Sequence, residues 1–399
     1  MLSIEFIREN IKAIKESCRQ RGIELNFDDF IEIDDQRRAA IQKVEDLRRQ
    51  RNELSQDQKP DSETIAKGQN LKEAIKKAEA EFRQFEEQVV QFITRVPNIL
   101  MPQVPAGTSE DDNVVLRNWG QPPKFDFEAK SYLELGEKLN LIDIPRAARM
   151  AGSRFSYLKN ELVLMQFALL NLVYEITQEF GFQPVIPPVM IKPKLMELLG
   201  YADLTENNIY FIEKDELNLV GTSEQSIAAM YQDEVLDEVP RRFVGYSTCF
   251  RREAGSYGRD LKGILRVHQF DKAELFSFCH PDNSSQEHEL LIKIEERIMQ
   301  SLELPYRVVL LCGGDLAKPS ATTVDIESWL PSEGKYRETH SSSNCTDYQS
   351  RGLNIRYRTP EGKLDYVHTL NGTALAMSRI LAVILENYQQ ADGTVAVPK

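Results

Sequence analysis

Charged and aromatic side chains occupy every second position of residues 264–275, which read I-L-R-V-H-Q-F-D-K-A-E-L. They follow a short run that ends in F-R-R-E at residues 250–253 and a glycine-punctuated segment. This pattern predicts a β-hairpin whose long loop, from Gly255 to Gly263, is mobile. Residues two apart share one face of a strand. The first strand therefore groups Arg251 with Glu253, and the second groups Arg266, His268, Phe270, Lys272 and Glu274.

Such a face has the chemistry to bind a compact polyanion that carries an aromatic base. Arginine forks match phosphate oxygens, and an aromatic ring stacks on a purine. A solvated hairpin face is the alternative, because alternating charge usually marks only a solvated surface. The segments around the hairpin must decide between these two interpretations.

The composition sets bounds on the class of protein. The 399 residues are enough for two domains, and 41% hydrophobic with 28% charged residues is typical of a globular protein. A formal charge of −13 argues against nucleic-acid binding unless basic residues gather on one element. Five cysteines without CxxC pairing indicate reduced thiols in a cytoplasmic protein and no structural zinc. The acidic start does not fit a signal peptide, and residues 162–176 are too short and polar to span a membrane.

The first hundred residues show helical periodicity. Isoleucines at positions 4, 7, 11 and 14 share one face, and Gly22 is expected to end that helix. Residues 33–94 then carry heptads on two helices separated by a polar break at residues 57–62. This predicts an antiparallel two-helix coiled coil that projects about 35 to 45 Å. The seam positions are Ile33, Arg37, Ala40, Val44, Leu47, Arg51 and Leu54, then Leu71, Ile75, Ala78, Phe82, Phe85, Val89 and Phe92.

The function of this arm has two interpretations. A dimerisation coiled coil is the commonest use of heptads. Basic residues nevertheless outnumber acidic ones over residues 37–53, within a chain that is acidic overall. Local basicity on a projecting rod suits contact with a phosphate backbone. The candidate RNA contacts are Arg37, Arg38, Lys43, Arg48, Arg49 and Arg51.

A linker and an apolar helix follow the arm. Prolines at positions 97, 102 and 105 end the second helix, so a domain boundary is expected near Gly107. Residues 151–180 begin with A-G-S-R-F-S-Y-L-K and then continue as a predicted helix that is apolar almost all round and therefore buried. A strand-like Val185-Ile186 runs from it into Pro187-Pro188.

Three later segments combine polar side chains with strand ends. T-S-E at residues 222–224 offers oxygens that can receive an ammonium group. E-T-H-S at residues 338–341 offers hard oxygen ligands for Mg²⁺, although an ordinary serine-rich loop is the simpler alternative. Last, a strand at residues 366–370 is expected to turn at residues 371–373 into an apolar helix with one arginine, Arg379. A buried guanidinium needs an anion, either a structural carboxylate or a nucleotide γ-phosphate.

With these segments in order, the chain resembles the seryl-tRNA synthetase family of class II aminoacyl-tRNA synthetases, in its bacterial form. The F-R-R-E hairpin resembles the second class II motif, the segment around Pro188 the first, and the helix with Arg379 the third. The resemblance implies an α+β fold. An antiparallel two-helix coiled-coil arm is expected to belong to a tRNA-binding domain, residues 1–106. The catalytic domain, residues 107–399, is expected to be an antiparallel β-sheet flanked by helices.

The same resemblance implies the reaction and the site residues. Seryl-adenylate forms from L-serine and ATP, and serine then passes to tRNA(Ser), with tRNA(Sec) as a further candidate substrate. The implied catalytic residues are Arg251, Glu253, Arg266 and Arg379. ATP is expected at Arg251, Arg252, Glu253, Arg266, Val267, Phe270, Glu338, Thr339, His340, Ser341 and Arg379, with Mg²⁺ at Glu338 and Ser341. Serine is expected at Thr222, Ser223, Glu224, Arg251, Glu274, Asn371 and Thr373.

Other functions are disfavoured by particular features. Neither GxxxxGK[ST] nor GxGxxG occurs, which argues against a P-loop or Rossmann site. A relative that only binds RNA is expected to have lost charged residues of the catalytic motifs, and these are present. A related ligase that loads carrier proteins is expected to lack the arm, which is present here. A threonine-specific relative needs a set of zinc ligands, and the cysteines and histidines of this chain do not occupy the corresponding positions. A cytoplasmic homodimer, joined around Pro188 and without a membrane segment, is therefore expected.

Overall fold

The computed structural model describes residues 1–55, 61–201, 208–253 and 263–398. It divides into two compact units. One comprises residues 2–19 and 23–96, and the other comprises residues 97–399 together with residues 1 and 20–22. The second unit thus begins before residue 107, where the sequence places the start of the catalytic domain. The boundary between the functional domains stays a prediction.

The described part of the first unit is built from helices. They are α1 (Ile4–Glu9), α2 (Ile11–Gln20), α3 (Phe27–Leu54) and α4 (Ser62–Ile93). One helix was expected from the first four isoleucines, but Asn10 ends α1, and its backbone and side-chain amides both donate to the carbonyl of Phe6. The two long helices begin at side-chain caps, because Asn26 and Asp61 accept hydrogen bonds from backbone amides of the first turn.

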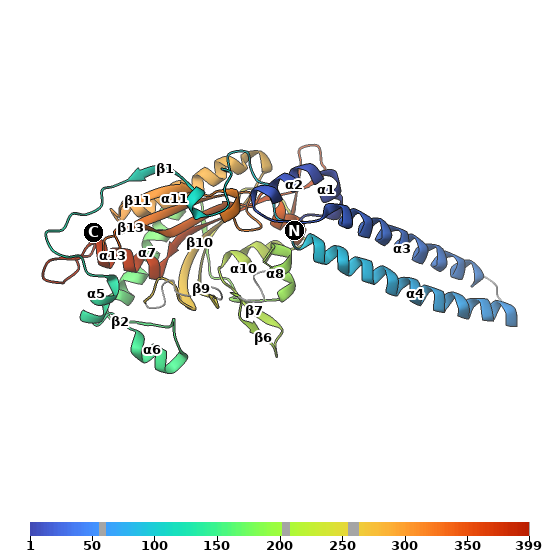
Figure 1. The fold of residues 1–399 in the computed structure, drawn as a ribbon, viewed down its shortest axis with the longest axis horizontal. Coiled ribbons are helices and arrows are strands. Elements are labelled where there is room, and N and C mark those ends of the chain that lie inside the picture. Colours follow the sequence, from blue (N-terminus) through green and yellow to red (C-terminus); the bar gives the residue numbers. More distant parts are fainter. Residues whose placement is uncertain (56–60, 202–207, 254–262, 399) are drawn as a thin grey trace. The chain divides into compact units, whose positions relative to one another are not determined.

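Helices α3 and α4 run side by side in opposite directions (Figure 1), which confirms the predicted arm. The buried seam consists of the small and branched residues Ala40, Val44, Ile75, Ala78 and Val89. Near the ends that carry residues 30 and 92, Phe92 stacks on Phe30 with ring centroids 4.7 Å apart. Of the two seam arginines, Arg37 pairs with Asp34 at 2.8 Å, and Arg51 is exposed.

An eight-stranded sheet forms the centre of the second unit, in the order β1-β11-β12-β13-β16-β10-β9-β4. Neighbouring strands pair antiparallel, except that β4 and β9 pair in parallel. This confirms the predicted antiparallel sheet. The strands are β1 (Val114–Trp119), β4 (Gln183–Val185), β9 (Arg241–Phe250), β10 (Gln269–Cys279), β11 (Tyr306–Leu310), β12 (Thr322–Leu330), β13 (Lys335–Asn344) and β16 (His368–Ala376).

Three helices pack with one face of this sheet in the largest apolar core. They are α7 (Glu161–Glu179), α11 (Ser284–Ser301) and α13 (Met377–Asn387). On β10, Ala273 and Leu275 point into this core. Because neighbours on a strand alternate, Lys272 and Glu274 belong to the opposite face. That opposite face carries the candidate site.

Shorter elements surround the sheet. The helices are α5 (Tyr132–Lys138), α6 (Ile144–Ala151), α8 (Pro193–Leu199), α10 (Glu224–Ala228) and α12 (Tyr348–Leu353). Short 3-10 helices are η1 (Glu110–Asp112), η2 (Ala229–Tyr231), η3 (Pro281–Asn283) and η4 (Gly313–Asp315). The short strands are β2 (Ile142–Asp143), β3 (Tyr157–Leu158), β5 (Met190–Ile191), β6 (Phe211–Ile212), β7 (Leu217–Leu219), β8 (Val235–Leu236), β14 (Arg356–Arg358) and β15 (Leu364–Tyr366).

Helix α7 differs from its prediction in burial. It begins at Glu161, after the segment A-G-S-R-F-S-Y-L-K as expected, but the expectation that it is buried all round is wrong. Leu164 and Phe167 are 70% and 54% exposed. Since the helix is apolar on all sides, its sequence does not distinguish the face that packs on the sheet from the face left to solvent.

The turn predicted at residues 371–373 is also wrong, because β16 continues through them to Ala376. The strand is paired on both sides, Thr373 with Glu274 of β10 and Gly372 with Ser342 of β13. This pairing overrides the local turn preference. A Cβ atom at position 372 would lie 2.8 Å from Oε1 of Glu295 in α11, so the Glu295 carboxyl would have to shift to admit any other residue.

The second hairpin strand starts later than its alternating sequence predicts. β10 begins at Gln269, so residues 264–268 do not continue the ladder. Apart from Gly263, the predicted mobile loop lies outside the described residues. Within the described ranges, no helix has the length and apolar character needed to cross a membrane.

Candidate active site

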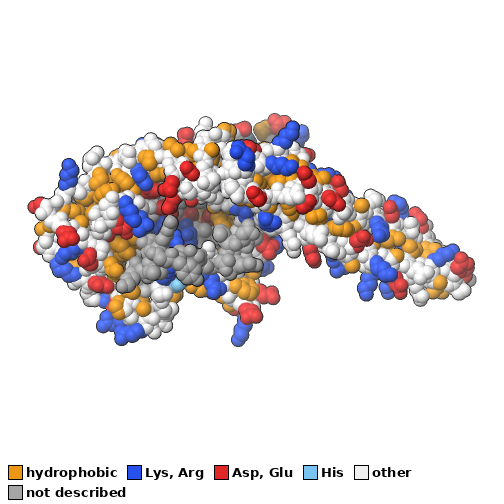
Figure 2. Space-filling model, in the orientation of Figure 1, with side chains coloured by type: hydrophobic (Ala, Val, Ile, Leu, Met, Phe, Trp, Pro, Cys, Tyr) orange, Lys and Arg blue, Asp and Glu red, His pale blue; other side chains and the backbone are white. Residues whose placement is uncertain are grey.

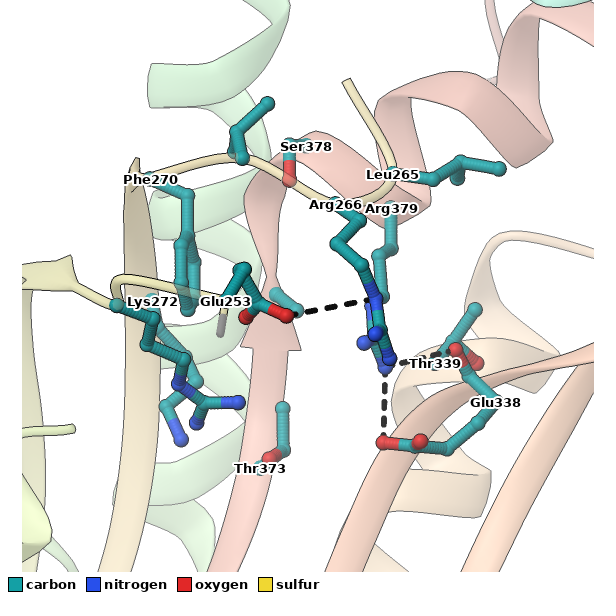
Figure 3. Close-up of a pocket in the computed structure, with 13 residues that line it drawn as sticks. Glu253, Leu265, Arg266, Phe270, Lys272, Glu338, Thr339, Thr373, Ser378 and Arg379 are labelled. Carbon is teal, nitrogen blue, oxygen red and sulfur yellow. Dashed lines mark hydrogen bonds and ion pairs between the residues drawn. The ribbon is translucent and has the colours of Figure 1, made fainter. Parts of the chain in front are cut away.

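The face of the sheet opposite the three covering helices carries a pocket of about 880 Å³. Its walls come from the end of β9, from β10, β13 and β16, and from α10 and α13. Figure 3 shows the part where charged side chains of these elements converge. Most of the predicted site residues line it: Thr222, Glu224, Arg251, Glu253, Arg266, Glu274, Glu338, Ser341, Asn371, Thr373 and Arg379.

Arg251 is fixed by two contacts on the hairpin side of the pocket. Its Nε donates to the carbonyl of Gly221 at 3.2 Å, and its guanidinium lies over the Phe270 ring, 5.4 Å from the centroid. An arginine held against an aromatic ring keeps a defined direction for its remaining N–H donors. Phe270, Val267 and Thr339, which the sequence assigns to ATP, line the adjoining part of the site.

Two further arginines are each paired with a carboxylate (Figure 3). Arg266 Nε lies 3.5 Å from Oε2 of Glu253. Arg379 Nη1 donates to Oε1 of Glu338 at 2.8 Å and to its carbonyl at 3.0 Å. Burial alone would raise the pKa of Glu338, but the Arg379 guanidinium holds it below its ordinary value. Of the two anions expected for Arg379, the structural carboxylate is therefore the one observed.

A β-bulge brings Glu338 and Ser341 to the same face of β13. They are three residues apart, which in a regular strand would place them on opposite faces. Glu338 pairs with Glu327 and His340 with Ile326, so Thr339 is an extra residue between them. Ser341 then pairs with Asp325, a buried carboxyl whose pKa is raised well above normal by burial and by the charge of Glu338.

This oxygen-rich corner fits a hard divalent cation. Oδ1 of Asp325 is buried and has no hydrogen-bond partner within the described ranges, and Glu338 and Ser341 lie beside it. Oxygen ligands are those that Mg²⁺ prefers. Among the described residues, no group of three or more His, Cys, Asp or Glu side chains has the arrangement of a metal site. Any cation here would therefore share its ligands with water or substrate.

The other end of the pocket holds buried carboxylates. Glu274 is 2% exposed and forms an ion pair with Lys272 two residues before it on β10. Thr373 faces Glu274 across the strand pair, and Asn371 lies two residues away on the same strand. Lys272 shares this face by strand alternation but was not among the residues predicted for the site.

Glu224 is the second carboxylate at this end. It begins α10, is 4% exposed, and lines the pocket with Thr222. Burial and the nearby charge of Glu274 raise its pKa. The expected contact at Ser223 is not observed, because its hydroxyl points away from the pocket and donates to the carbonyl of Gly245 at 3.1 Å.

Three other expected residues lie away from the pocket. Arg252 stacks over Tyr210, 5.6 Å from the ring centroid. His340 is fully buried beyond the bulge, where burial lowers its pKa to about 3. His268 does not share the face of Phe270, because it precedes β10, and its Nδ1 lies 2.9 Å from the carbonyl of Arg251.

Residues that the sequence analysis did not select also belong to the site. Tyr201 and Lys272 line the pocket, and Asp325 lies beside Ser341. Only Lys272 had a signal in the sequence, the two-residue alternation with Glu274. Tyr201 and Asp325 are brought to the site by the tertiary fold, and no local sequence pattern predicts this.

The predicted RNA contacts on the arm are largely ion-paired within it. Exposed ion pairs contribute only about 0–1 kcal/mol, so a phosphate backbone can compete for Lys43, Arg48 and Arg49. Arg37 and Arg38 instead pair with Asp34, which has no exposed surface. Lysines of α4 add exposed positive charge that the sequence analysis did not select: Lys67, Lys72, Lys76 and Lys77. The pairs are Arg37 and Arg38 with Asp34, Lys43 with Glu81, Arg48 with Glu79, and Arg49 with Asp46.

Comparison with known proteins covers the whole chain. The class II tRNA synthetase core domain (G, H, P, S and T) matches residues 209–388, and the seryl-tRNA synthetase N-terminal domain matches residues 1–100. The serine–tRNA ligase of Dictyoglomus turgidum is 42% identical over 410 residues, covering 100% of this chain and 96% of that protein. The serine–tRNA ligase of Rubrobacter xylanophilus is 40% identical, with the same coverage.

Solved structures agree with the sequence comparisons. The crystal structure of seryl-tRNA synthetase from Pyrococcus horikoshii complexed with ATP has a TM-score of 0.89 and 39% identity, and covers 100% of this chain and 96% of its own. The cytoplasmic serine–tRNA ligase from Naegleria fowleri in complex with AMP has a TM-score of 0.83 and 33% identity, with 98% and 93% coverage. The chain therefore belongs to the seryl-tRNA synthetase family.

Proposed function

We propose that this protein is an ATP-dependent serine–tRNA ligase. The observation that carries the proposal is the chemical division of one pocket. Arg251, Arg266 and Arg379 supply positive charge at one end, and the buried carboxylates Glu224 and Glu274 lie at the other. A substrate pair with a polyphosphate on one side and an ammonium with a small hydroxyl on the other matches this division.

The first step is activation of serine. A carboxylate oxygen of serine attacks the α-phosphorus of ATP, the bond to the bridging oxygen breaks, and pyrophosphate leaves. Arg251 and Arg266 neutralise the charge that develops on the phosphoryl oxygens, and Arg379 receives the γ-phosphate in competition with Glu338. Phe270 stacks on the adenine. The protein positions its substrates and neutralises charge, and it forms no covalent bond with them.

Glu338 and Ser341 would hold Mg²⁺ here, with Asp325 beside them. A bound Mg²⁺ would supply charge neutralisation for the phosphates. Displacement of Arg379 from Glu338 by the nucleotide would leave the Glu338 carboxylate available as a ligand. The bulge at Thr339 keeps this carboxylate and the Ser341 hydroxyl on one face.

The second step transfers serine to tRNA. A hydroxyl of the terminal ribose attacks the acyl carbon of the adenylate, and AMP leaves. The basic side chains of α3 and α4 in the arm bind the tRNA. The expected substrate is tRNA(Ser), and tRNA(Sec) is a further candidate. Glu253 is assigned to the adenine amino group or to the tRNA end.

A homodimer is the proposed assembly, in the cytoplasm. Leu164 and Phe167 of α7 and Ile186, which is 79% exposed, are apolar residues left to solvent in the single chain. They belong to the helix–strand segment that leads into Pro187-Pro188. Large exposed apolar patches commonly mark protein interfaces, and most homo-oligomers are closed dimers.

Pyrophosphate exchange with each of the twenty amino acids tests the proposal. Serine alone should support rapid exchange of label between pyrophosphate and ATP. Exchange that is faster with another amino acid, or equal with several, would contradict the assignment of substrate.

A further inference from the structure

A chain of buried hydrogen bonds leads from the sheet to Glu224. The Thr369 hydroxyl, on β16, donates to Oε1 of Gln349 on α12 at 2.7 Å. The amide nitrogen of Gln349 donates to Oε1 of Glu224 at 2.7 Å. Both Thr369 and Gln349 have no exposed surface. Three separate elements are therefore joined at one carboxylate by side chains that do not line the pocket.

The direction of this chain is set by chemistry. An ionised carboxylate only accepts hydrogen bonds, so the group of Gln349 that faces it must be the amide NH₂. The amide oxygen then faces Thr369, whose hydroxyl is the donor that it needs. Each donor in the chain thus faces an acceptor. Reversing the Gln349 amide would place its oxygen against the Glu224 carboxylate, and both groups are acceptors.

Among the described residues, two side chains donate to Glu224, and both meet the same oxygen. Tyr201 donates its hydroxyl to the same Oε1 at 2.9 Å, from the segment that follows α8. The carboxylate is thus held through a single oxygen by two neutral donors. Its other oxygen, Oε2, is left to serve the pocket, where a substrate ammonium supplies donors and no acceptor.

We propose that Gln349 is a positioning residue for the substrate ammonium and acts only through Glu224. Thr369 in turn sets the orientation of the Gln349 amide. This inference rests on the proposed function, in which Glu224 receives the ammonium of serine. It adds a residue of α12, buried behind the pocket, to the determinants of serine affinity.

The charge around Glu224 makes such support necessary. Burial and the Glu274 carboxylate raise the pKa of Glu224, whereas Gln349, Tyr201 and Lys272 act to lower it. The Cys345 thiol is the other titratable neighbour, and its own pKa is raised by burial and by the charge of Glu224. Without the Gln349 donor, Glu224 should hold its proton to higher pH and bind an ammonium less well.

The Gln349→Met variant tests the proposal, because methionine is similar in length and lacks the donor. Serine-dependent pyrophosphate exchange should show a KM for serine raised about tenfold or more, as expected for a lost hydrogen bond to a charged group. The KM for ATP should change less than about twofold. The acid limb of kcat/KM for serine should move to higher pH. Ser350→Ala is the matched control, since Ser350 is buried on the same helix and, in the described part of the chain, its hydroxyl donates to the backbone carbonyls of Asp347 and Val367.

Thr369 provides a second, independent measurement. Thr369→Val removes the hydroxyl at constant shape and should raise the KM for serine in the same direction, whereas Thr369→Ser should restore it. The effects of Thr369→Val and Gln349→Met should be non-additive, because both act through one carboxylate. Additive effects, or equal changes in the KM for ATP and serine, would show that these residues merely support the fold.

Glu224→Gln separates this inference from the proposed function. If Glu224→Gln weakens serine and Gln349→Met does not, Gln349 has no positioning role and the assignment of Glu224 stands. If Glu224→Gln leaves the KM for serine unchanged, the ammonium site itself is misplaced, and the positioning role falls with it.

Discussion

Single carboxyls carry much of the chemistry in this protein, and their surroundings differ. Glu338 is held ionised by Arg379, and Glu274 is paired with Lys272. Glu295, on α11 beneath Gly372, is fully buried with neither oxygen bonded to a described protein group. Burial and the charge of Glu274 raise its pKa well above normal. Glu338 and Glu295, two carboxyls of one small region, thus have pKa values that are shifted in opposite directions.

Removal of Glu274 should abolish recognition of serine but not of ATP. A site built to hydrogen-bond a substrate hydroxyl can lose up to about 10⁴-fold when that bond is lost. We expect Glu274→Ala to reduce serine-dependent pyrophosphate exchange by several orders of magnitude. Glu274→Gln, which keeps the shape, controls for the unpaired Lys272 that alanine leaves behind. Serine turnover within tenfold of the unmodified protein for both variants would rule out this role for Glu274.

Glu295 should make the protein less stable as pH rises. The native state keeps the proton that the unfolded chain releases near pH 4.5, so the stabilisation is complete below that pH and declines above it. Glu295→Gln mimics the protonated acid and should gain relative stability by up to about 1.4 kcal/mol per pH unit above that point. Urea unfolding of both proteins at pH 5 and pH 8 measures the difference. An equal difference at the two pH values would mean that Glu295 titrates normally.

At the scale of elements, the sequence predicted the parts that follow a regular period. The heptads of α3 and α4 and the alternation of Lys272 with Glu274 both appear in the structure. The departures come where a strand is irregular. The bulge at Thr339 and the strand through Asn371 depend on pairing with distant strands, so no local pattern reveals them. The same is true of Asp325 and Gln349, which reach the site from other elements.

The arm should serve the second step only. Its seam lies within residues 33–92, outside every segment that lines the pocket. Replacing most of α3 and α4 with a short linker should leave adenylate formation largely intact and abolish transfer to tRNA. Exchange and aminoacylation assays on the same preparation compare the two steps. An equal loss of both would mean that the arm supports the catalytic unit.

At the scale of the whole molecule, the exposed apolar face of α7 makes assembly testable. Phe167→Glu places a charge where the proposed dimer would bury a ring, and this should produce a monomer of about 45.8 kDa by light scattering. Ile65→Glu is the matched control, since Ile65 is 52% exposed on α4 of the arm. A stable, fully active monomer of the unmodified protein would contradict the proposed assembly.

The strand β10 separates a dry core from the pocket with a wall one residue thick. Ala273 and Leu275 face the covering helices, and Lys272 and Glu274 face the pocket. A point substitution on this strand therefore changes either packing or ligand binding. Deletion or insertion of one residue within β10 would move its side chains to the opposite face of the sheet. Two charged side chains would then point into the core and two apolar ones into the pocket. Natural variants and engineered libraries should therefore tolerate substitutions along β10 far better than insertions or deletions.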